Sequence, residues 1–297
     1  MNFLVTGAWK EAEKYIPIMK KMGHSLAFLQ YEKDPVPCAS DWPEGIICNG
    51  LFLHHSIENF INLKYIQLTS AGFDRVPMDY VRAHNITINN ARGVYSIPMA
   101  EFALAGVLFL YKKLFFFADN RKNGVWEKNR SLLELWGKTV LVLGCGSVGS
   151  ECAKRFSAMG CRVLGCDIFP YENSAFEKIY NIEKCDSLIG ESDIMIVTLP
   201  LTETTEKYIN RYRLSLMKDT SVLVNISRGR VIDENALEKY IGKIGGAVLD
   251  VFEEEPLSQD SPLWAKENIL ITPHNSFVSE NNDERLSRLI ISNLEKE

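Results

Sequence analysis

The sequence predicts an α/β fold that contains two doubly wound parallel sheets. Short runs rich in β-branched and aromatic residues alternate with helical stretches along the chain, which is typical of parallel α/β proteins. The length of 297 residues suits one large domain or two ordinary ones. Hydrophobic residues make up 46% and charged residues 24%, so the composition is that of a soluble globular protein with a sizeable core.

Five candidate strands make up the first predicted domain. They cover residues 2–6, 25–30, 45–48, 64–69 and 86–89. The last residues, 281–297, look helical and polar, and we expect them to return to this sheet. The first domain is therefore predicted to comprise residues 1–95, completed by residues 277–297. The chain would then cross between its domains twice, which would make a hinge and a cleft.

A long apolar helix is expected next, from about Pro98 to Phe117. Ser96 is a suitable N-cap, and Pro98 suits the first turn, where a missing N–H costs little. A helix that is apolar on most faces needs two surfaces to bury against. We expect one of them to be its own sheet and the other a partner subunit, so the 98–117 region predicts a homodimer.

The second predicted domain, residues 96–276, contains a sheet that starts with the apolar run 138–143. Such a run is expected of a strand that is covered on both faces. Helices are expected at 148–159, ended by Gly160, and at 233–241, opened by Asp233 as N-cap. The later candidate strands are residues 162–166, 193–198, 221–225, 246–249 and 269–272.

Three glycines follow the first strand of this second domain. Gly144, Gly146 and Gly149 stand between the apolar run and a predicted helix, and Asp167 follows at the end of the next candidate strand. This context fits a dinucleotide-binding loop, with the pyrophosphate at the helix N-terminus and the carboxylate on the ribose hydroxyls. A carboxylate repels a 2′-phosphate, and residues 168–170 supply no arginine to receive one. NAD is therefore expected in preference to NADP.

Composition and termini argue against several other classes of protein. The net charge of −5 and the isoelectric point of about 5.7 do not suit a surface that binds nucleic acid or anionic membranes. The first residues lack the features of a signal peptide, and the apolar stretch 102–110 is too short to span a bilayer. The seven cysteines show no metal-ligand spacing, so we expect free thiols, no metal site and a cytoplasmic location.

Several stretches of the chain match one known family. They are residues 67–74, 90–93 with 100–101, 135–140, the glycine loop, 199–202, 225–229, 249–256 and 272–274. From about Leu63 to Phe277 the chain resembles the D-isomer-specific 2-hydroxyacid dehydrogenases. This resemblance implies a Rossmann NAD-binding domain and a smaller flavodoxin-like substrate domain.

The resemblance also implies roles for individual residues. Arg228, Glu255 and His274 would occupy the catalytic positions, and Asp250 would hold the nicotinamide amide. The backbone of Ser70, Ala71 and Gly72 would receive the substrate carboxylate together with Arg228. Further cofactor contacts are implied at the glycine loop and beyond it, namely at Ser147, Val148, Pro200, Thr205, Ile226 and Ser227.

The chemistry of the three catalytic candidates fits these roles. Hydride addition to a 2-oxo acid leaves an alkoxide that must take a proton, and histidine is a natural general acid near neutral pH. A carboxylate such as that of Glu255 favours the protonated imidazole and orients the ring. The forked guanidinium of Arg228 can bind carboxylate and carbonyl oxygens in a way that lysine cannot imitate.

The sequence therefore predicts an enzyme that interconverts a small D-2-hydroxy acid and its 2-oxo acid with NAD. Phosphoglycerate oxidation is an alternative within the enzymes, with Arg75 and Arg92 as candidate cations for the phosphate. A second alternative is an NAD(H)-sensing protein of the corepressor type, which would bind the dinucleotide without turnover. Formate oxidation fits less well, because formate needs no acid–base pair. The substrate side chain and the physiological direction stay open.

Overall fold

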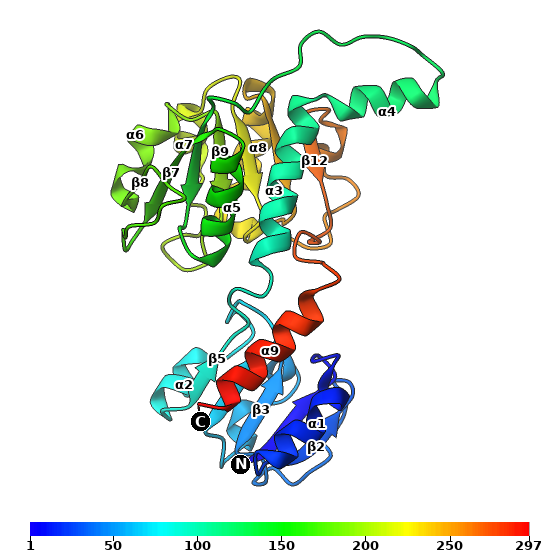
Figure 1. Ribbon diagram of the computed structural model, residues 1–297, viewed down its shortest axis with the longest axis vertical. Coiled ribbons are helices and arrows are strands. Elements are labelled where there is room, and N and C mark those ends of the chain that lie inside the picture. Colours follow the sequence, from blue (N-terminus) through cyan, green and yellow to red (C-terminus); the bar gives the residue numbers. More distant parts are fainter. Residues whose placement is uncertain (297) are drawn as a thin grey trace. The chain divides into compact units, whose positions relative to one another are not determined.

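The computed structural model describes residues 1–296, which form two compact units. The first unit consists of Met1–Tyr95 and Ser279–Glu297, and the second of Ser96–Val278. Each unit contains one parallel sheet with helices on both of its faces (Figure 1). The predicted fold class, two doubly wound parallel sheets, is confirmed.

The sheet of the first unit has five parallel strands in the order β2-β1-β3-β4-β5. This order is that of flavodoxin-like sheets. Each predicted strand is present, with ends that differ by at most one residue from the expected ones. The strands are β1 (Asn2–Thr6), β2 (Ser25–Leu29), β3 (Gly45–Cys48), β4 (Tyr65–Leu68) and β5 (Thr87–Asn89).

Two helices cover one face of this sheet, α1 (Ala12–Lys21) and α9 (Asn282–Leu294). The C-terminal segment was expected to be helical and polar and to return to this sheet, and α9 does so. It is amphipathic: its buried side includes Leu286, Ile290 and Leu294, because four-residue spacing places these side chains on one stripe. Residue 297 of the predicted segment lies outside the described residues.

The opposite face of the first sheet is covered by shorter elements. Val81 of α2 (Met78–Ala83) packs there, and so do Leu51 and Ile57 of two short 3-10 turns, Leu51–Leu53 and Ile57–Asn59. Both faces of β1 and β3 are therefore covered, which explains the hydrophobic runs in the sequence of these two strands.

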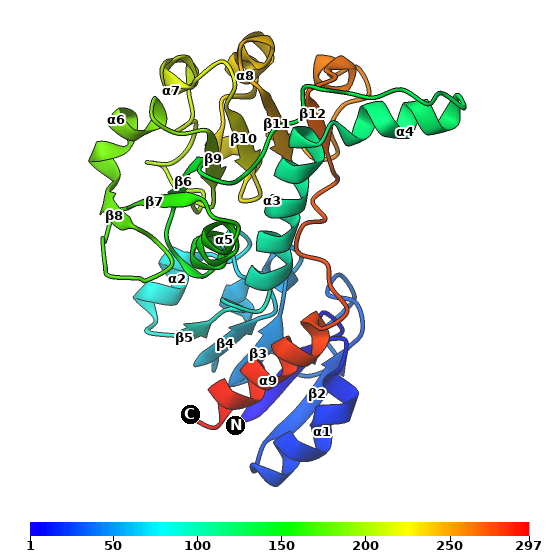
Figure 2. The same cartoon turned by 45° about the horizontal axis from the view of Figure 1, so that its top comes forward.

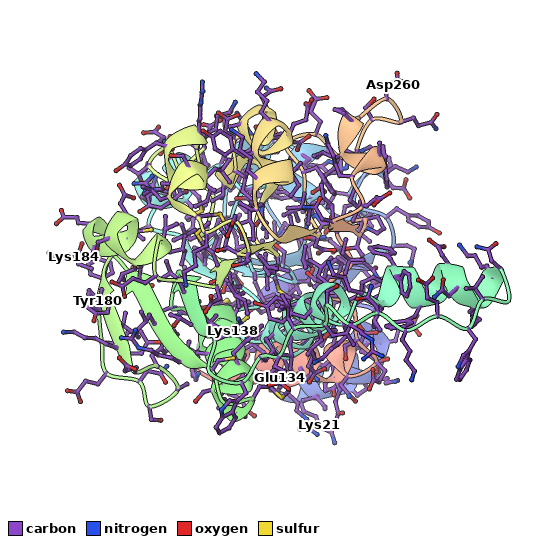
Figure 3. All side chains as sticks on the ribbon, turned by 90° about the horizontal axis from the view of Figure 1, so that it is seen from above. Lys21, Glu134, Lys138, Tyr180, Lys184 and Asp260 are labelled. Atoms are coloured by element: carbon purple, nitrogen blue, oxygen red, sulfur yellow. The ribbon has the colours of Figure 1, made fainter. Side chains whose placement is uncertain are left out.

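The sheet of the second unit has seven parallel strands in the order β12-β11-β10-β9-β6-β7-β8. From β8 to β11 this is the 3-2-1-4-5-6 order of Rossmann sheets. One strand, β8, was not predicted; Tyr180 lies in it and Lys184 just after it (Figure 3). The bounds are β6 (Thr139–Leu143), β7 (Arg162–Asp167), β8 (Lys178–Asn181), β9 (Ile194–Val197), β10 (Val222–Asn225), β11 (Gly246–Leu249) and β12 (Ile269–Ile271).

Helices pack on both faces of the seven-stranded sheet (Figure 2). On one face lie α3 (Ser96–Tyr111) and α5 (Ser147–Ala158). On the other lie α6 (Cys185–Ile189), α7 (Arg211–Leu216) and α8 (Glu234–Tyr240). Asp233 caps α8, as predicted: its carboxylate accepts from the N–H of Ala236 at 3.0 Å.

The single long helix expected from Pro98 to Phe117 is instead two helices. The first, α3, ends at Tyr111, and α4 (Leu114–Lys122) begins after Lys113, whose φ of +52° places it in the left-handed region. One residue in this conformation ends a right-handed helix. Ser96 is not an N-cap either, because it lies inside α3 with its Oγ buried and without a partner among the described residues.

Helix α4 has no buried residue and projects from the rest of its unit (Figure 3). The segment that returns from it is also exposed, and Trp126 is 98% exposed. Within residues 1–296, no helix has both the length and the apolar character needed to cross a membrane.

Strand order fixes where ligands can bind in the second unit. The chain leaves β6 toward β7 and later returns to β9 on the other side of β6, so the topological switch point lies between β6 and β9. Crevices at the carboxyl ends of such strands are the usual ligand sites of open α/β sheets. The loops after β6, β7, β9, β10, β11 and β12 all emerge at this edge.

Candidate active site

The glycine loop follows β6 at the switch point. Gly144 has a φ of +89°, which an L side chain rarely adopts, and a Cβ there would come within 3.0 Å of the Thr198 backbone. A Cβ on Gly149 would lie 2.1 Å from the Gly144 carbonyl oxygen. The chain therefore turns tightly between β6 and α5 and packs against the loop after β9, which only glycine at these positions permits.

The N-terminus of α5 suits a pyrophosphate. Gly146 is its N-cap and makes no side-chain cap hydrogen bond, and Ser147 and Val148 form its first turn. The first backbone N–H groups of a helix carry partial positive charge and bind anions. The predicted cofactor residues Gly144, Gly146, Ser147, Val148 and Gly149 thus lie in one turn, whose geometry fits a dinucleotide.

Asp167 lies at the end of β7, beside this loop. Its Oδ2 accepts from the N–H of Cys145 at 2.7 Å and its Oδ1 from the N–H of Phe169 at 3.0 Å. A carboxylate can accept about four hydrogen bonds, so capacity remains on both oxygens. The carboxylate is held in place and can still accept from the two hydroxyls of a ribose.

The loop after β9 contains two more predicted cofactor residues, Pro200 and Thr205. The hydroxyl of Thr205 donates to the Pro200 carbonyl at 2.6 Å and accepts from the N–H of Thr202 at 2.7 Å. The Thr198 hydroxyl donates to the Gly144 carbonyl at 2.6 Å and so ties this loop to the glycine loop. Thr205 therefore has a structural role in its own loop, whatever contacts it makes with a ligand.

The turn after β10 places Ile226, Ser227 and Arg228. The side chain of Asn225 holds this turn: its Oδ1 accepts from the N–H and hydroxyl of Ser227, and its Nδ2 donates to the carbonyl of Arg228 at 3.0 Å. Ile226 and Ser227 are buried. The guanidinium of Arg228 donates to its neighbour's carbonyl, that of Ser227, at 2.8 Å.

Asp250 follows β11 and is 0% exposed. Its Oδ1 accepts from the Thr272 hydroxyl at 2.6 Å and from the N–H of Asn275 at 2.7 Å, and its Oδ2 accepts from the N–H of Ser276 at 2.9 Å. Its backbone carbonyl accepts from the N–H of His274 at 2.7 Å. Asp250 thus holds the loop after β12, and its carboxylate is fully buried among these donors.

Glu255 and His274 meet at this same edge. The Nδ1 atom of His274 lies 2.8 Å from Oε2 of Glu255, while Oε1 of Glu255 accepts from the N–H of Phe252 at 3.1 Å. His274 has a φ of +50°, an uncommon conformation that the Asp250 hydrogen bonds impose. Phe277 packs edge-on to the imidazole, with 6.0 Å between ring centroids.

The segment that carries Glu255 is fixed by a reciprocal exchange with α8. The N–H of Glu234 donates to the Glu253 carboxylate at 2.9 Å, and the N–H of Glu253 donates to the Glu234 carboxylate at 3.0 Å. Lys207 lies 3.6 Å from the same Glu253 carboxylate. Burial, together with the neighbouring acidic side chains, raises the pKa of Glu234 above its usual value.

The first unit contains the predicted carboxylate-binding backbone, Ser70 to Gly72, just after β4. Carbonyls of this turn are occupied: those of Ser70 and Ala71 accept from the Ala91 N–H at 2.8 Å and from Asn90 Nδ2 at 2.6 Å. The N–H groups of Ala71 and Gly72 have no hydrogen-bond partner within residues 1–296. Free N–H groups in one turn are suited to an anion.

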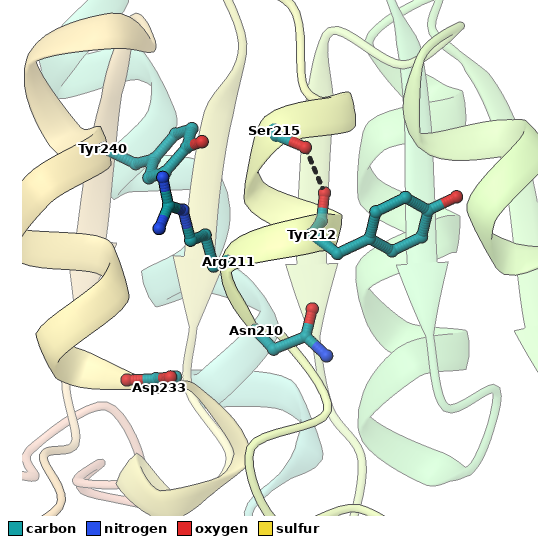
Figure 4. Close-up of a pocket in the computed structure, with 6 residues that line it drawn as sticks. All are labelled: Asn210, Arg211, Tyr212, Ser215, Asp233 and Tyr240. Carbon is teal, nitrogen blue, oxygen red and sulfur yellow. Dashed lines mark hydrogen bonds between the residues drawn. The ribbon is translucent and has the colours of Figure 1, made fainter.

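A separate hollow of about 500 Å³ lies beside α7 and α8 (Figure 4). Two of its lining residues are helix caps, because Asn210 accepts from the N–H of Arg213 and Asp233 from that of Ala236. None of the predicted site residues lines it. The full lining is Asn210, Arg211, Tyr212, Ser215, Asp233 and Tyr240.

Some residues that shape the site were not predicted from the sequence. Asn225, Thr198 and Thr272 make side-chain hydrogen bonds that fix the loops, and Tyr171 donates to the Cys145 carbonyl. Asn225 and the two threonines stand at or directly after a strand that precedes a ligand loop, which is a usable signal. Tyr171 had no such signal, because it lies in an irregular exposed segment.

Comparison with known proteins agrees with this geometry. Residues 104–276 match the family model of the D-isomer specific 2-hydroxyacid dehydrogenase NAD binding domain. The chain is 30% identical over 244 residues to (S)-sulfolactate dehydrogenase of Chromohalobacter salexigens, covering 81% of this chain and 79% of that protein. It is 37% identical over 216 residues to D-3-phosphoglycerate dehydrogenase of Archaeoglobus fulgidus, which covers 72% of this chain and 41% of that protein.

A solved structure gives the same result for the fold. The D-lactate dehydrogenase of Aquifex aeolicus, complexed with NAD and lactic acid, superposes with a TM-score of 0.81 at 27% identity. The match covers 99% of this chain and 94% of that one. The chain therefore belongs to the D-isomer specific 2-hydroxyacid dehydrogenase family.

Proposed function

We propose that this protein interconverts a small D-2-hydroxy acid and the corresponding 2-oxo acid, with NAD as the hydride carrier. The observation that carries the proposal is the Glu255–His274 pair, joined at 2.8 Å at the same sheet edge as the glycine loop. Residues 96–276 serve as the dinucleotide-binding domain, and residues 1–95 with 277–297 as the substrate domain.

His274 handles the proton in this reaction. Nδ1 faces Glu255, so Nε2 on the opposite side of the ring is the atom available to the substrate oxygen. In reduction, Nε2 gives its proton to the oxygen that becomes the hydroxyl; in oxidation it takes that proton back. Glu255 orients the ring through its contact with Nδ1.

Two groups are proposed for substrate binding, one in each unit. In the second unit, the Arg228 guanidinium binds carboxylate and carbonyl oxygens. In the first unit, the free N–H groups of Ala71 and Gly72 in the Ser70–Gly72 turn bind a carboxylate. NAD held at the glycine loop and Asp167 would supply the chemistry of hydride transfer at C2 of the substrate. Asp250 keeps the His274 loop in place.

NAD is preferred to NADP in this proposal. The support is the Asp167 carboxylate at the end of β7, which can accept from ribose hydroxyls and repels a 2′-phosphate. Residues 163–177 contain no lysine or arginine that could receive the phosphate. The expected preference is at least about tenfold in kcat/KM, which corresponds to roughly 1.4 kcal/mol.

The experiment is a panel of 2-oxo acids assayed with NADH and, in parallel, NADPH. It contains glyoxylate, pyruvate, hydroxypyruvate, its phosphate ester, and branched and aromatic acids. Reduction of at least one, with D stereochemistry in the product, supports the proposal. Oxidation of 3-phosphoglycerate with little turnover of the unphosphorylated acids would favour the phosphoglycerate reaction. NADH binding without any turnover would favour a dinucleotide sensor.

The protein acts as a homodimer through the region of residues 98–117. Support comes from α4, a helix of nine residues with no buried side chain, although it contains three consecutive phenylalanines, Phe115 to Phe117. Such a short helix is marginal in water without a packing partner, and two-fold dimers are the commonest oligomers. Light scattering should give twice the monomer mass, and Phe115→Glu with Phe116→Glu should reduce it to the monomer mass.

The proposed location is the cytoplasm. All seven cysteines are free and six of them are buried, as suits a protein that folds under reducing conditions. Fractionation of the source cells with an activity assay tests this location.

A further inference from the structure

A chain of hydrogen bonds joins the segment after β7 to the glycine loop. The Tyr171 hydroxyl donates to the Cys145 carbonyl at 2.5 Å. The Ser150 hydroxyl lies 3.0 Å from the Tyr171 hydroxyl and 3.2 Å from the same carbonyl, and Asn173 Nδ2 donates to Ser150 at 3.1 Å. These three side chains, Tyr171, Ser150 and Asn173, are called the clasp below.

The directions of these bonds follow from the hydrogens available. The single hydroxyl hydrogen of Tyr171 goes to the Cys145 carbonyl, so its oxygen accepts from its neighbours. Nδ2 of Asn173 can only donate, and its Oδ1 accepts from the N–H of Ala175 at 3.0 Å. Every side chain of the clasp therefore has hydrogen-bond partners, and a connected network of this kind favours a single arrangement of its side chains.

The clasp acts on Cys145, the residue that Asp167 also contacts. The Asp167 carboxylate accepts from the N–H of Cys145, and the carbonyl of Cys145 accepts from Tyr171, so the residue is tied on both sides. The segment between has little packing of its own, because Ile168 is 61% and Phe169 77% exposed. Hydrogen bonds rather than burial thus keep the residues after Asp167 beside the glycine loop, whereas Asp167 itself is also held in β7 by its pairing with β8.

We propose that the clasp of Tyr171, Ser150 and Asn173 sets the selectivity of this protein for NADH over NADPH by holding Asp167 in place. This inference rests on the proposed function only for the identity of the cofactor. A fixed carboxylate accepts from both ribose hydroxyls, and it cannot move away from a 2′-phosphate. The carboxylate of Glu172 in the same segment adds to the repulsion, and no cation is present there.

The test is equilibrium binding of NADH and NADPH to the purified full-length protein, followed by nicotinamide fluorescence without substrate. Tyr171→Phe keeps the ring and removes the hydroxyl. The ratio of the two dissociation constants should fall by at least about threefold, the scale of one lost hydrogen bond. A disordered glycine loop would weaken the binding of NADH and NADPH by the same factor, so this effect would cancel in the ratio of the two dissociation constants.

Two further variants separate selectivity from stability. Tyr212→Phe is the matched control, because the Tyr212 hydroxyl makes no hydrogen bond within residues 1–296, and its ratio should stay at the wild-type value. In the Asp167→Asn background, Tyr171→Phe should no longer change the ratio, because the clasp acts through that carboxylate. Asn173→Ala replaces Tyr171→Phe if the latter fails to fold; it removes the donor to Ser150 and Tyr171 and also the acceptor for the N–H of Ala175.

The outcomes are distinct. A Tyr171→Phe protein that binds both cofactors more weakly by the same factor would overturn the inference and reduce the clasp to a structural role. A wild-type ratio near one would overturn it as well. Selective NADH binding that depends on Tyr171, in a protein that reduces no oxo acid, would support the clasp while contradicting the proposed reaction.

Discussion

The Nδ1 atom of His274 lies 2.8 Å from Oε2 of Glu255, and the two side chains are 39% and 38% exposed. Both sit on loops held by other residues: Asp250 binds the loop of His274, and the N–H of Phe252 binds the second oxygen of Glu255. The contact between the two side chains is therefore fixed by the loops that carry them, and water can still reach it. A pair that is prearranged yet solvent-accessible is suited to proton exchange with a substrate.

Glu255→Gln should lower kcat while NADH affinity stays unchanged. The Glu255 carboxylate lies 2.8 Å from Nδ1 of His274, and an amide that turns its NH₂ group toward this atom cannot hold the ring in the same way. Steady-state kcat in both directions and NADH fluorescence titration measure the two effects. An unchanged kcat, with chemistry rate-limiting, would show that Glu255 does not position His274.

His274→Ala should lower kcat by roughly 100-fold or more, the usual scale for a general acid. NADH affinity should stay within about twofold, because the glycine loop and Asp167 are untouched. Stopped-flow reduction and NADH fluorescence titration measure the two quantities. His84→Ala is the control: it removes an exposed imidazole at the end of α2 whose contacts within residues 1–296 are with Tyr80, and it should retain full activity. If His274→Ala kept near wild-type turnover across pH, His274 would not be the general acid of the reaction.

Arg228→Lys should raise KM for the oxo acid by roughly tenfold and also lower kcat. A lysine keeps the charge but cannot make the forked contact to carboxylate and carbonyl oxygens. Steady-state kinetics with a fixed saturating NADH concentration give both constants. Arg230→Lys, on the next turn and paired with Glu206 at the surface, is the matched control and should leave both constants unchanged. Equal effects of the two substitutions would contradict a binding role for Arg228.

Most strands and the glycine loop could be predicted from the sequence because burial on both faces leaves a local signal. Strand β8 has a single buried residue, Ile179, so its sequence shows no such apolar run. The break between α3 and α4 was missed as well, because Lys112 and Lys113 have good helix propensity and only the backbone conformation at Lys113 reveals the end.

The residue types of the site could be predicted from the sequence, but the hydrogen bonds that hold these residues in place could not. Asp250 contacts Thr272, Asn275 and Ser276, which lie 22 to 26 positions further along the chain. No periodicity or local motif encodes such contacts, since they arise only when β11 and β12 are adjacent. The reciprocal hydrogen bonds between Glu234 and Glu253 could not be predicted either. They form because α8 and the segment after β11 meet in the tertiary fold.

Asp250→Asn should destabilise the protein and slow turnover together. An amide can replace only one carboxylate oxygen, so an NH₂ group would face either the N–H of Ser276 or the two donors at Oδ1. A buried donor left without an acceptor costs about 1–3 kcal/mol. Thermal unfolding and kcat measure the two effects. Thr272→Val removes a single donor and should be milder in both, and the reverse order would contradict the role of Asp250 in holding the loop.

Glu234→Gln should stabilise the protein at neutral pH more than at acidic pH. Burial raises the pKa of Glu234, so the folded protein holds this proton more tightly than the unfolded chain does. The folded state is therefore favoured at low pH, where Glu234 is neutral in both states, and it loses stability as the pH rises past the ordinary value and toward the raised one. Glutamine is neutral at every pH and can still accept from the N–H of Glu253, so it escapes this loss. The Tm advantage of the variant should grow by roughly 1 °C or more between pH 4.5 and pH 7.5.

Glu203→Gln removes an exposed charge in the same unit and controls for the change in net charge. A Tm difference that is the same at both pH values would show that folding does not oppose the charge of Glu234.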